Sequence, residues 1–108
     1  MTKNGMRPIH PGEILKAEYL EPLGMSANAL AKALKVPASR IGDILLERRG
    51  ITTDTALRLA QFFGGDAQSW LNLQQTYDLK MAEKSSLKSI QKEVAPLVTY
   101  IERVALAT

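Results

Sequence analysis

The apolar residues of this chain recur every three or four positions almost from end to end, which is the spacing of one face of an α-helix. No segment shows the sustained two-residue alternation of β-branched side chains that a half-buried strand requires. Residues that cap or break helices interrupt the pattern at short intervals, so the helices can fold against one another. The sequence therefore predicts an all-α protein.

Five helices are predicted in the first 79 residues from these start and stop signals. The first runs from about Pro11 to Leu20 and is closed by Pro22 and Gly24, since both residue types end helices. The others are expected over about 26–34, from near 37, over 52–63 and from 66 onward, with starts marked by Ser26, Pro37, Thr52 and Asp66. The inward face of the second helix is expected to consist of Leu30, Ala33 and Leu34.

After about Leu79 the composition shifts to Lys, Ser and Glu, and apolar residues return at alternating intervals of three and four. They are Leu87, Ile90, Val94, Leu97, Ile101 and Val104. This is the spacing of a coiled-coil seam, but Pro96 lies within it, so the helix is expected to kink or restart there. We predict a domain of residues 1–79 and a helical C-terminal extension of residues 80–108. The extension either folds back onto the domain or contacts a partner.

The stretch from Ser26 to Leu45 has the pattern of a helix-turn-helix motif. Two short helices that cross at a steep angle need a small residue where they touch and an apolar residue in the turn, and Ala31 and Val36 suit these roles. Ile41 and Leu45 then anchor the third helix to the core. With these positions inward, the residues expected to point outward are Ala38, Ser39, Arg40 and Asp43.

These four residues are the predicted contacts to DNA bases, because the outward face of the second helix of such a motif enters the major groove. Arg40 can donate two hydrogen bonds to O6 and N7 of guanine, and Ser39 can donate to a base or a phosphate. Asp43 either accepts from cytosine or orients Arg40. Gly42 weakens a helix interior by about 1 kcal/mol, and both close approach to the groove and neutral drift explain its presence.

Six further residues at the edges of this face are the predicted contacts to DNA phosphates. They are Ser26, Asn28, Lys32, Lys35, Arg48 and Arg49. Free amides at the start of the second helix suit an anion, and cationic side chains suit the DNA backbone. The formal net charge of +3 lies in the part of the chain that contains this face. Residues 1–65 hold nine Lys and Arg against six acidic residues, while residues 66–108 hold five of each.

A series of short segments carries a specific resemblance to a known family. Residues 10–15 read His-Pro-Gly-Glu-Ile-Leu, residues 49–52 read Arg-Gly-Ile-Thr, residues 54–60 read Asp-Thr-Ala-Leu-Arg-Leu-Ala, and residues 70–74 read Trp-Leu-Asn-Leu-Gln. With these segments, about residues 7–79 closely resemble the HigA (VapI-like) antitoxins of the Xre helix-turn-helix superfamily. The resemblance implies a five-helix, lambda-repressor-like domain that dimerises and represses its own promoter by binding double-stranded operator DNA. It also implies direct binding and neutralisation of a HigB-type toxin that cleaves messenger RNA.

The chain departs from the family pattern at two places in the motif and at one directly after it. Lys35 lies where the family usually has glycine, Gly42 replaces a polar residue, and Leu46-Glu47 replaces Asn-Gly. These departures leave the predicted fold intact but change the surface that meets DNA, so the sequence does not predict the operator.

The residues present do not favour an enzyme. The chain has no Cys and one His, so it offers no thiol nucleophile, thiolate metal site or disulfide. His10 and Glu13 alone do not supply three metal ligands, and His10 is expected to pack or hydrogen-bond at the start of the first helix. We expect no enzyme activity, no catalytic residue, no metal and no cofactor.

No apolar run approaches the roughly 18 residues that a membrane span needs, and the start of the chain lacks a signal-peptide pattern. A cytoplasmic protein without membrane contact is expected. A homodimer is expected because one recognition helix reads few base pairs, and its contact would lie in the fifth helix or in residues 80–108. Two alternatives to the antitoxin are a stand-alone repressor without a toxin and a protein-interaction module that no longer binds DNA. In the second, Trp70 and Tyr77 would be exposed anchors.

Overall fold

The computed structural model describes residues 7–107, and every regular element in this range is a helix. By its internal contacts the chain divides into two units, Met1–Asp78 and Leu79–Thr108. The elements are α1 (Pro11–Ile14), η2 (Leu15–Leu20), α2 (Glu21–Leu23), α3 (Ala27–Leu34), α4 (Ala38–Leu45), α5 (Thr53–Phe63), α6 (Ala67–Glu93) and α7 (Leu97–Ala107). The predicted all-α fold with a helical C-terminal extension is confirmed.

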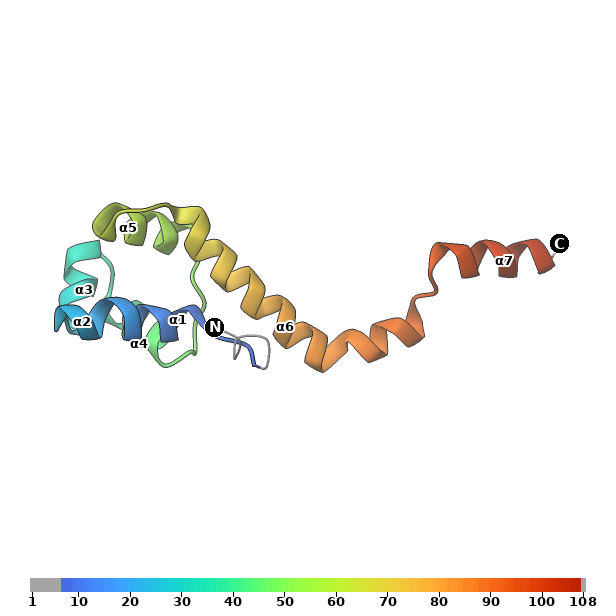
Figure 1. Ribbon diagram of the computed structural model, residues 1–108, viewed down its shortest axis with the longest axis horizontal. Coiled ribbons are helices and arrows are strands. Elements are labelled where there is room, and N and C mark those ends of the chain that lie inside the picture. The colour runs from blue at the N-terminus through green and yellow to red at the C-terminus, as the bar shows by residue number, and fades with distance from the viewer. Residues whose placement is uncertain (1–6, 108) are drawn as a thin grey trace. The chain divides into compact units, whose positions relative to one another are not determined.

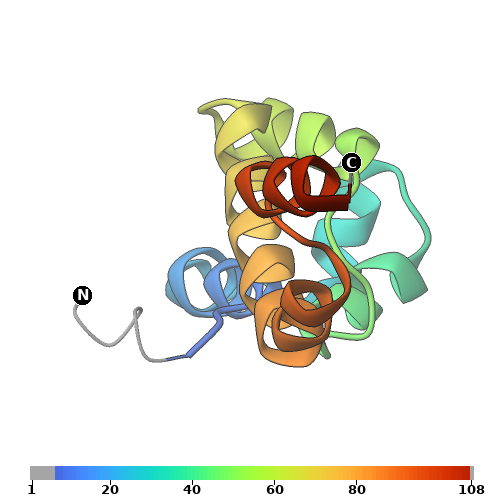
Figure 2. The ribbon, with the colours of Figure 1, turned by 90° about the vertical axis from the view of Figure 1, so that its right-hand side faces the viewer.

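The segments α1, η2 and α2 follow one another without a break and form one helical rod (Figure 1, Figure 2). The rod continues past its predicted end at Leu20 to Leu23, with Pro22 inside the last turn. The η2 segment is π-helical, and the N–H of Glu21 reaches back to the carbonyl of Lys16. This wider turn accommodates Pro22, which has no N–H to donate. Gly24, with φ of 62°, then ends the rod.

The predicted N-caps of three later helices are confirmed. The Ser26 Oγ accepts from the backbone N–H of Ala29 at 3.1 Å, and the Thr52 Oγ1 accepts from that of Thr55 at 3.3 Å. An Asp66 carboxylate oxygen accepts from the N–H of Ser69 at 2.8 Å. Because each cap uses an amide that has no partner within its helix, the caps place the starts of α3, α5 and α6.

The core of the first unit lies where α3, α4, α5 and the first turns of α6 meet the rod. Its most buried apolar side chains include Leu15, Leu30, Leu34, Ile41, Ile44, Leu59 and Trp70. In α3 the small inward residue is Ala31, whereas Ala33 is exposed, so the prediction that Ala33 faces the core is wrong. Trp70 is only 4% exposed and is therefore a core residue rather than a surface anchor.

The rod approaches α4 closely at Gly12. A Cβ at this position would overlap the carbonyl oxygen of Ile44, so the approach requires glycine. The neighbouring His10 caps the rod, since its Nδ1 accepts from the N–H of Gly12 at 2.9 Å. The buried His10 ring also lies edge-on to Tyr77, with ring centroids 4.9 Å apart. The expected packing role of His10 is confirmed.

Gln74 ties the loop between α4 and α5 to α6. Its side-chain oxygen accepts from the N–H of Ile51 at 2.7 Å. A Cβ at Gly50 would lie 2.8 Å from the Gln74 side chain, so glycine is needed beside this link. The link holds the backbone immediately before the Thr52 cap, and it thereby positions the start of α5.

In the second unit, α6 continues beyond Leu79 to Glu93, and residues 94–96 separate it from α7 (Figure 1). The predicted interruption at Pro96 is confirmed, because proline cannot continue the helix. The apolar seam residues are all exposed; they are Leu87, Ile90, Val94, Leu97, Ile101 and Val104. None of the helices within residues 7–107 is both long and apolar enough to span a membrane.

Candidate nucleic-acid interface

The helix α4 presents its first turn outward while its other side is held in the core. Ile41 and Ile44 are fully buried, and Leu45 is half-buried. Ala38 and Ser39 are exposed. Ile41 and Ile44 share the buried face because they are three residues apart, whereas Ser39, two residues before Ile41, lies on the other side of the helix. The outward orientation predicted for Ala38 and Ser39 is confirmed.

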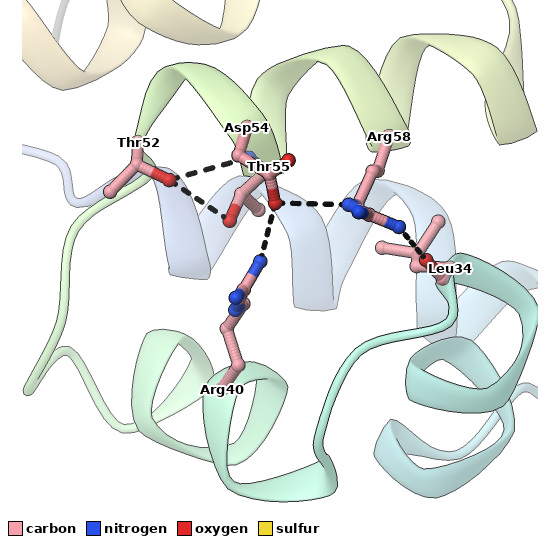
Figure 3. A network of polar contacts seen from close by, with 6 residues as sticks. All are labelled: Leu34, Arg40, Thr52, Asp54, Thr55 and Arg58. Carbon is pink, nitrogen blue, oxygen red and sulfur yellow. Dashed lines mark hydrogen bonds and ion pairs between the residues drawn. The ribbon is translucent and has the colours of Figure 1, made fainter.

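Arg40 lies at one edge of this exposed face and is bound by α5. Its guanidinium donates to a carboxylate oxygen of Asp54 at 2.6 Å (Figure 3). The same oxygen accepts from Nε of Arg58 at 2.9 Å, and Arg58 also donates to the carbonyl of Leu34 at 2.9 Å. The Arg40 side chain remains 28% exposed. One carboxylate therefore joins Arg40 of α4 to Arg58 of α5, which in turn contacts the end of α3.

The charge of Asp54 is stabilised by this arrangement. The Arg40 guanidinium, followed by that of Arg58, holds the pKa of the Asp54 carboxyl below its ordinary value. Both cations hydrogen-bond to the ionised form, which favours loss of the proton. Asp54 is consequently an anion at neutral pH, and it lies beside a side chain predicted to contact DNA.

Asp43, the other acidic residue near this face, has different partners from those considered in the sequence. Its two carboxylate oxygens lie 3.8 Å from Arg48 and 3.9 Å from Arg49. Arg40 is paired with Asp54 instead, so the interpretation that Asp43 orients Arg40 is wrong. The alternative, in which Asp43 accepts from a base, stays a prediction. The structure brings Asp43 together with two of the predicted phosphate contacts.

The predicted phosphate contacts on α3 lie at its two ends. Ser26 uses its hydroxyl as the N-cap, and Ser26 and Asn28 are both exposed beside the free amides of the first turn. Lys32 and Lys35 are exposed near the C-terminal end. These residues are therefore accessible to solvent at both ends of α3, as contacts to DNA phosphates require.

Two of the departures from the family pattern coincide with left-handed backbone. Lys35 has φ of 61° and ends α3, and Glu47 has φ of 61° in the loop after α4. Glycine adopts this conformation without steric cost, whereas other residues are strained in it. Both side chains therefore occupy turns in which an L-residue costs stability.

Sequence reasoning missed two residues of this interface, Asp54 and Arg58. Both lie in the segment 54–60 that carries the family resemblance, but neither was given a role in DNA binding from the sequence. Their four-residue separation on α5 is typical of a helical ion pair and was a usable signal. The connection to Arg40 had no sequence signal, because the two elements are joined by a loop of non-helical backbone. Within residues 7–107, no three His, Cys, Asp or Glu side chains gather as a metal site would need.

Comparison with known proteins gives matches over most of the chain. A family described as helix-turn-helix matches residues 16–70. Virulence-associated protein I from Dichelobacter nodosus is 61% identical, over 96% of this chain and 94% of that protein. A solved HigA-family addiction module antidote protein from Coxiella burnetii is 59% identical with a TM-score of 0.79, covering 83% of this chain and 98% of that one. The antitoxin HigA of Pseudomonas aeruginosa, solved with the higBA promoter, is 49% identical with a TM-score of 0.82, covering 84% of this chain and 99% of that one.

Proposed function

The chain belongs to the HigA (VapI-like) family of helix-turn-helix antitoxins, and we propose that it represses its own promoter and neutralises a HigB-type toxin by direct binding. The observation that carries the DNA-binding half is the exposed first turn of α4, held from behind by Ile41 and Ile44. The solved complex of P. aeruginosa HigA with promoter DNA supports the same use of the fold.

In the proposed complex α4 enters the major groove. Ala38, Ser39, Arg40 and Asp43 face the base edges, with Arg40 on guanine as the main source of sequence discrimination. The proposed contacts to phosphates are Ser26, Asn28, Lys32, Lys35, Arg48 and Arg49. These contacts set the register of the protein on DNA, whereas the base contacts select the sequence.

A homodimer binds the operator in this proposal. Two recognition helices about 34 Å apart, which is one turn of DNA, read a two-fold symmetric site with far better discrimination than one helix does. Toxin neutralisation is stoichiometric, so messenger RNA cleavage is the chemistry of the toxin and this chain has no catalytic role. The proposed location is the cytoplasm, where promoter and toxin are both present.

Substitution Arg40→Ala tests the DNA-reading assignment. We expect specific binding to a labelled fragment of the chain's own promoter to weaken by about 1–3 kcal/mol, roughly 5- to 150-fold. Fluorescence anisotropy at one fixed salt concentration measures the Kd. Lys16→Ala removes one positive charge from an exposed position on η2, outside the proposed DNA and dimer contacts, and serves as the control. Equal binding by wild type and Arg40→Ala would show that Arg40 does not read the operator.

Co-expression tests the toxin half separately. We expect a short toxin gene beside the gene for this chain. Its product, expressed alone, should stop growth, and this chain should restore growth and co-purify with it. Failure of both readouts, with intact promoter binding, would leave a stand-alone repressor.

A further inference from the structure

Arg40, Asp54 and Arg58 form an ion-pair network at the edge of α4. We propose that Asp54 is a positioning residue for DNA recognition: it fixes the direction of Arg40 and holds down the affinity of the domain for DNA of any sequence. The proposal rests on the proposed DNA-binding function, and it concerns how that function becomes selective.

Arg40 binds a carboxylate, that of Asp54, which a second arginine also holds in place. The Asp54 oxygen that binds Arg40 at 2.6 Å also binds Arg58 at 2.9 Å. Arg58 is in turn anchored on the carbonyl of Leu34, at the end of the first helix of the motif. Asp54 is therefore held from behind, and it holds the Arg40 guanidinium at a set place relative to α3 and α4 (Figure 3).

The network is not what keeps α5 folded onto the domain. The Asp54 side chain is 55% exposed, and exposed ion pairs contribute little to stability. The start of α5 is capped by Thr52, and the helix is anchored by the buried Ala56 and Leu59. A role in recognition explains why a carboxylate occupies this exposed position beside a predicted DNA contact.

Two physical effects of the carboxylate favour cognate over random DNA. Only one hydrogen bond joins Arg40 to Asp54, and a guanidinium has five N–H donors, so the rest can still reach a base or phosphate. Because the side chain is already ordered, the cognate contact loses less conformational entropy on binding. At the same time, the negative charge offsets the cations and repels phosphates, which weakens the sequence-independent part of binding.

The test is Asp54→Asn, which keeps the side-chain shape and removes the charge. The Kd is measured for a promoter fragment and for a scrambled duplex of the same length, at several salt concentrations. We expect scrambled DNA to bind about tenfold more tightly, with the logarithmic salt dependence steeper by about one unit per protomer. The ratio of scrambled to promoter Kd should fall about tenfold.

Three further variants separate this role from general effects. Glu18→Gln makes the same change of net charge on η2, where the residue is exposed, and should leave the ratio unchanged. Asp54→Glu keeps the charge at the start of α5 and should retain most of the discrimination. In an Arg40→Ala background, Asp54→Asn should change the ratio of scrambled to promoter Kd less than threefold, because Asp54 acts through Arg40. Circular dichroism at the assay temperature confirms that each variant is folded.

The outcomes are distinguishable. An unchanged ratio in Asp54→Asn, with a wild-type protein that selects its promoter, overturns the positioning role and leaves the proposed function standing. An equal effect of Asp54→Asn with and without Arg40 also overturns it. Equal binding of both duplexes by the wild-type protein would instead refute the proposed DNA-binding function, and the positioning role with it.

Discussion

Gly42 lies inside α4, where glycine is a poor choice for stability. Glycine in a helix interior costs about 1 kcal/mol relative to alanine, because its unfolded backbone has more freedom to lose. A Cβ built on Gly42 meets no atom within 4 Å, so alanine introduces no clash. We therefore expect Gly42→Ala to raise the free energy of unfolding by about 0.5–1 kcal/mol, and the Tm by about 2–8 °C.

Thermal and urea denaturation followed by circular dichroism measure this change. The matched control is Gly12→Ala, another helical glycine, whose Cβ would overlap the carbonyl oxygen of Ile44. This control should lose about 1–3 kcal/mol through overpacking. A Tm for Gly42→Ala at or below the wild-type value, with the control destabilised, would refute the claim that the outer side of α4 is open at this position.

The same variant separates the two interpretations of Gly42. Weaker promoter binding by a more stable protein would identify close approach to the groove as the reason for glycine. Unchanged binding would identify the glycine as dispensable. Stability and affinity therefore have to be measured on the same preparation.

The remaining predictions concern strain, charge and burial. Lys35→Gly should stabilise by about 0.5–1 kcal/mol in urea denaturation, because relief of the left-handed strain outweighs the entropy of glycine, and no gain would contradict the strain. The pKa of Asp54 is lowered by Arg40 and then Arg58, so the small stabilisation from its exposed ion pairs is fully present above its unfolded pKa of about 3.9 and is lost as pH falls through the lower folded pKa. The wild-type Tm should thus fall more than that of Asp54→Asn between about pH 6 and about pH 3, and parallel losses would refute the pairing. His10→Ala should cost about 1–3 kcal/mol by removing a cap and buried packing, which urea midpoints measure, and an unchanged midpoint would show that neither contributes.

Local features were predictable wherever the physics is local. Ser26, Thr52 and Asp66 marked helix starts correctly because a cap bonds an amide only a few residues away. Pro96 marked the break before α7 for an equally local reason. The end of the first helix was misplaced because the π-helical turn that admits Pro22 has no clear signal in residue spacing.

The exposed face of α4 was also accessible from the sequence, while the partners of its charged residues were not. Spacing alone placed Ile41 inward and Ser39 outward, since the helical period relates them directly. It did not indicate that Arg40 would meet Asp54, or that Asp43 would instead meet two arginines of the following loop. Ion-pair partners depend on the crossing of helices and on loop paths, which residue spacing does not specify.

The sequence by itself thus determined the helices, the motif and the family, because periodicity, caps and short motifs act over a few neighbouring residues. Only the tertiary structure decided that Gly12 admits the rod against α4, that Gln74 holds the loop at Ile51, and that Asp54 binds Arg40. Each of these contacts joins separate elements. Their existence follows from how the packed core orients those elements, and that orientation is a property of the whole fold.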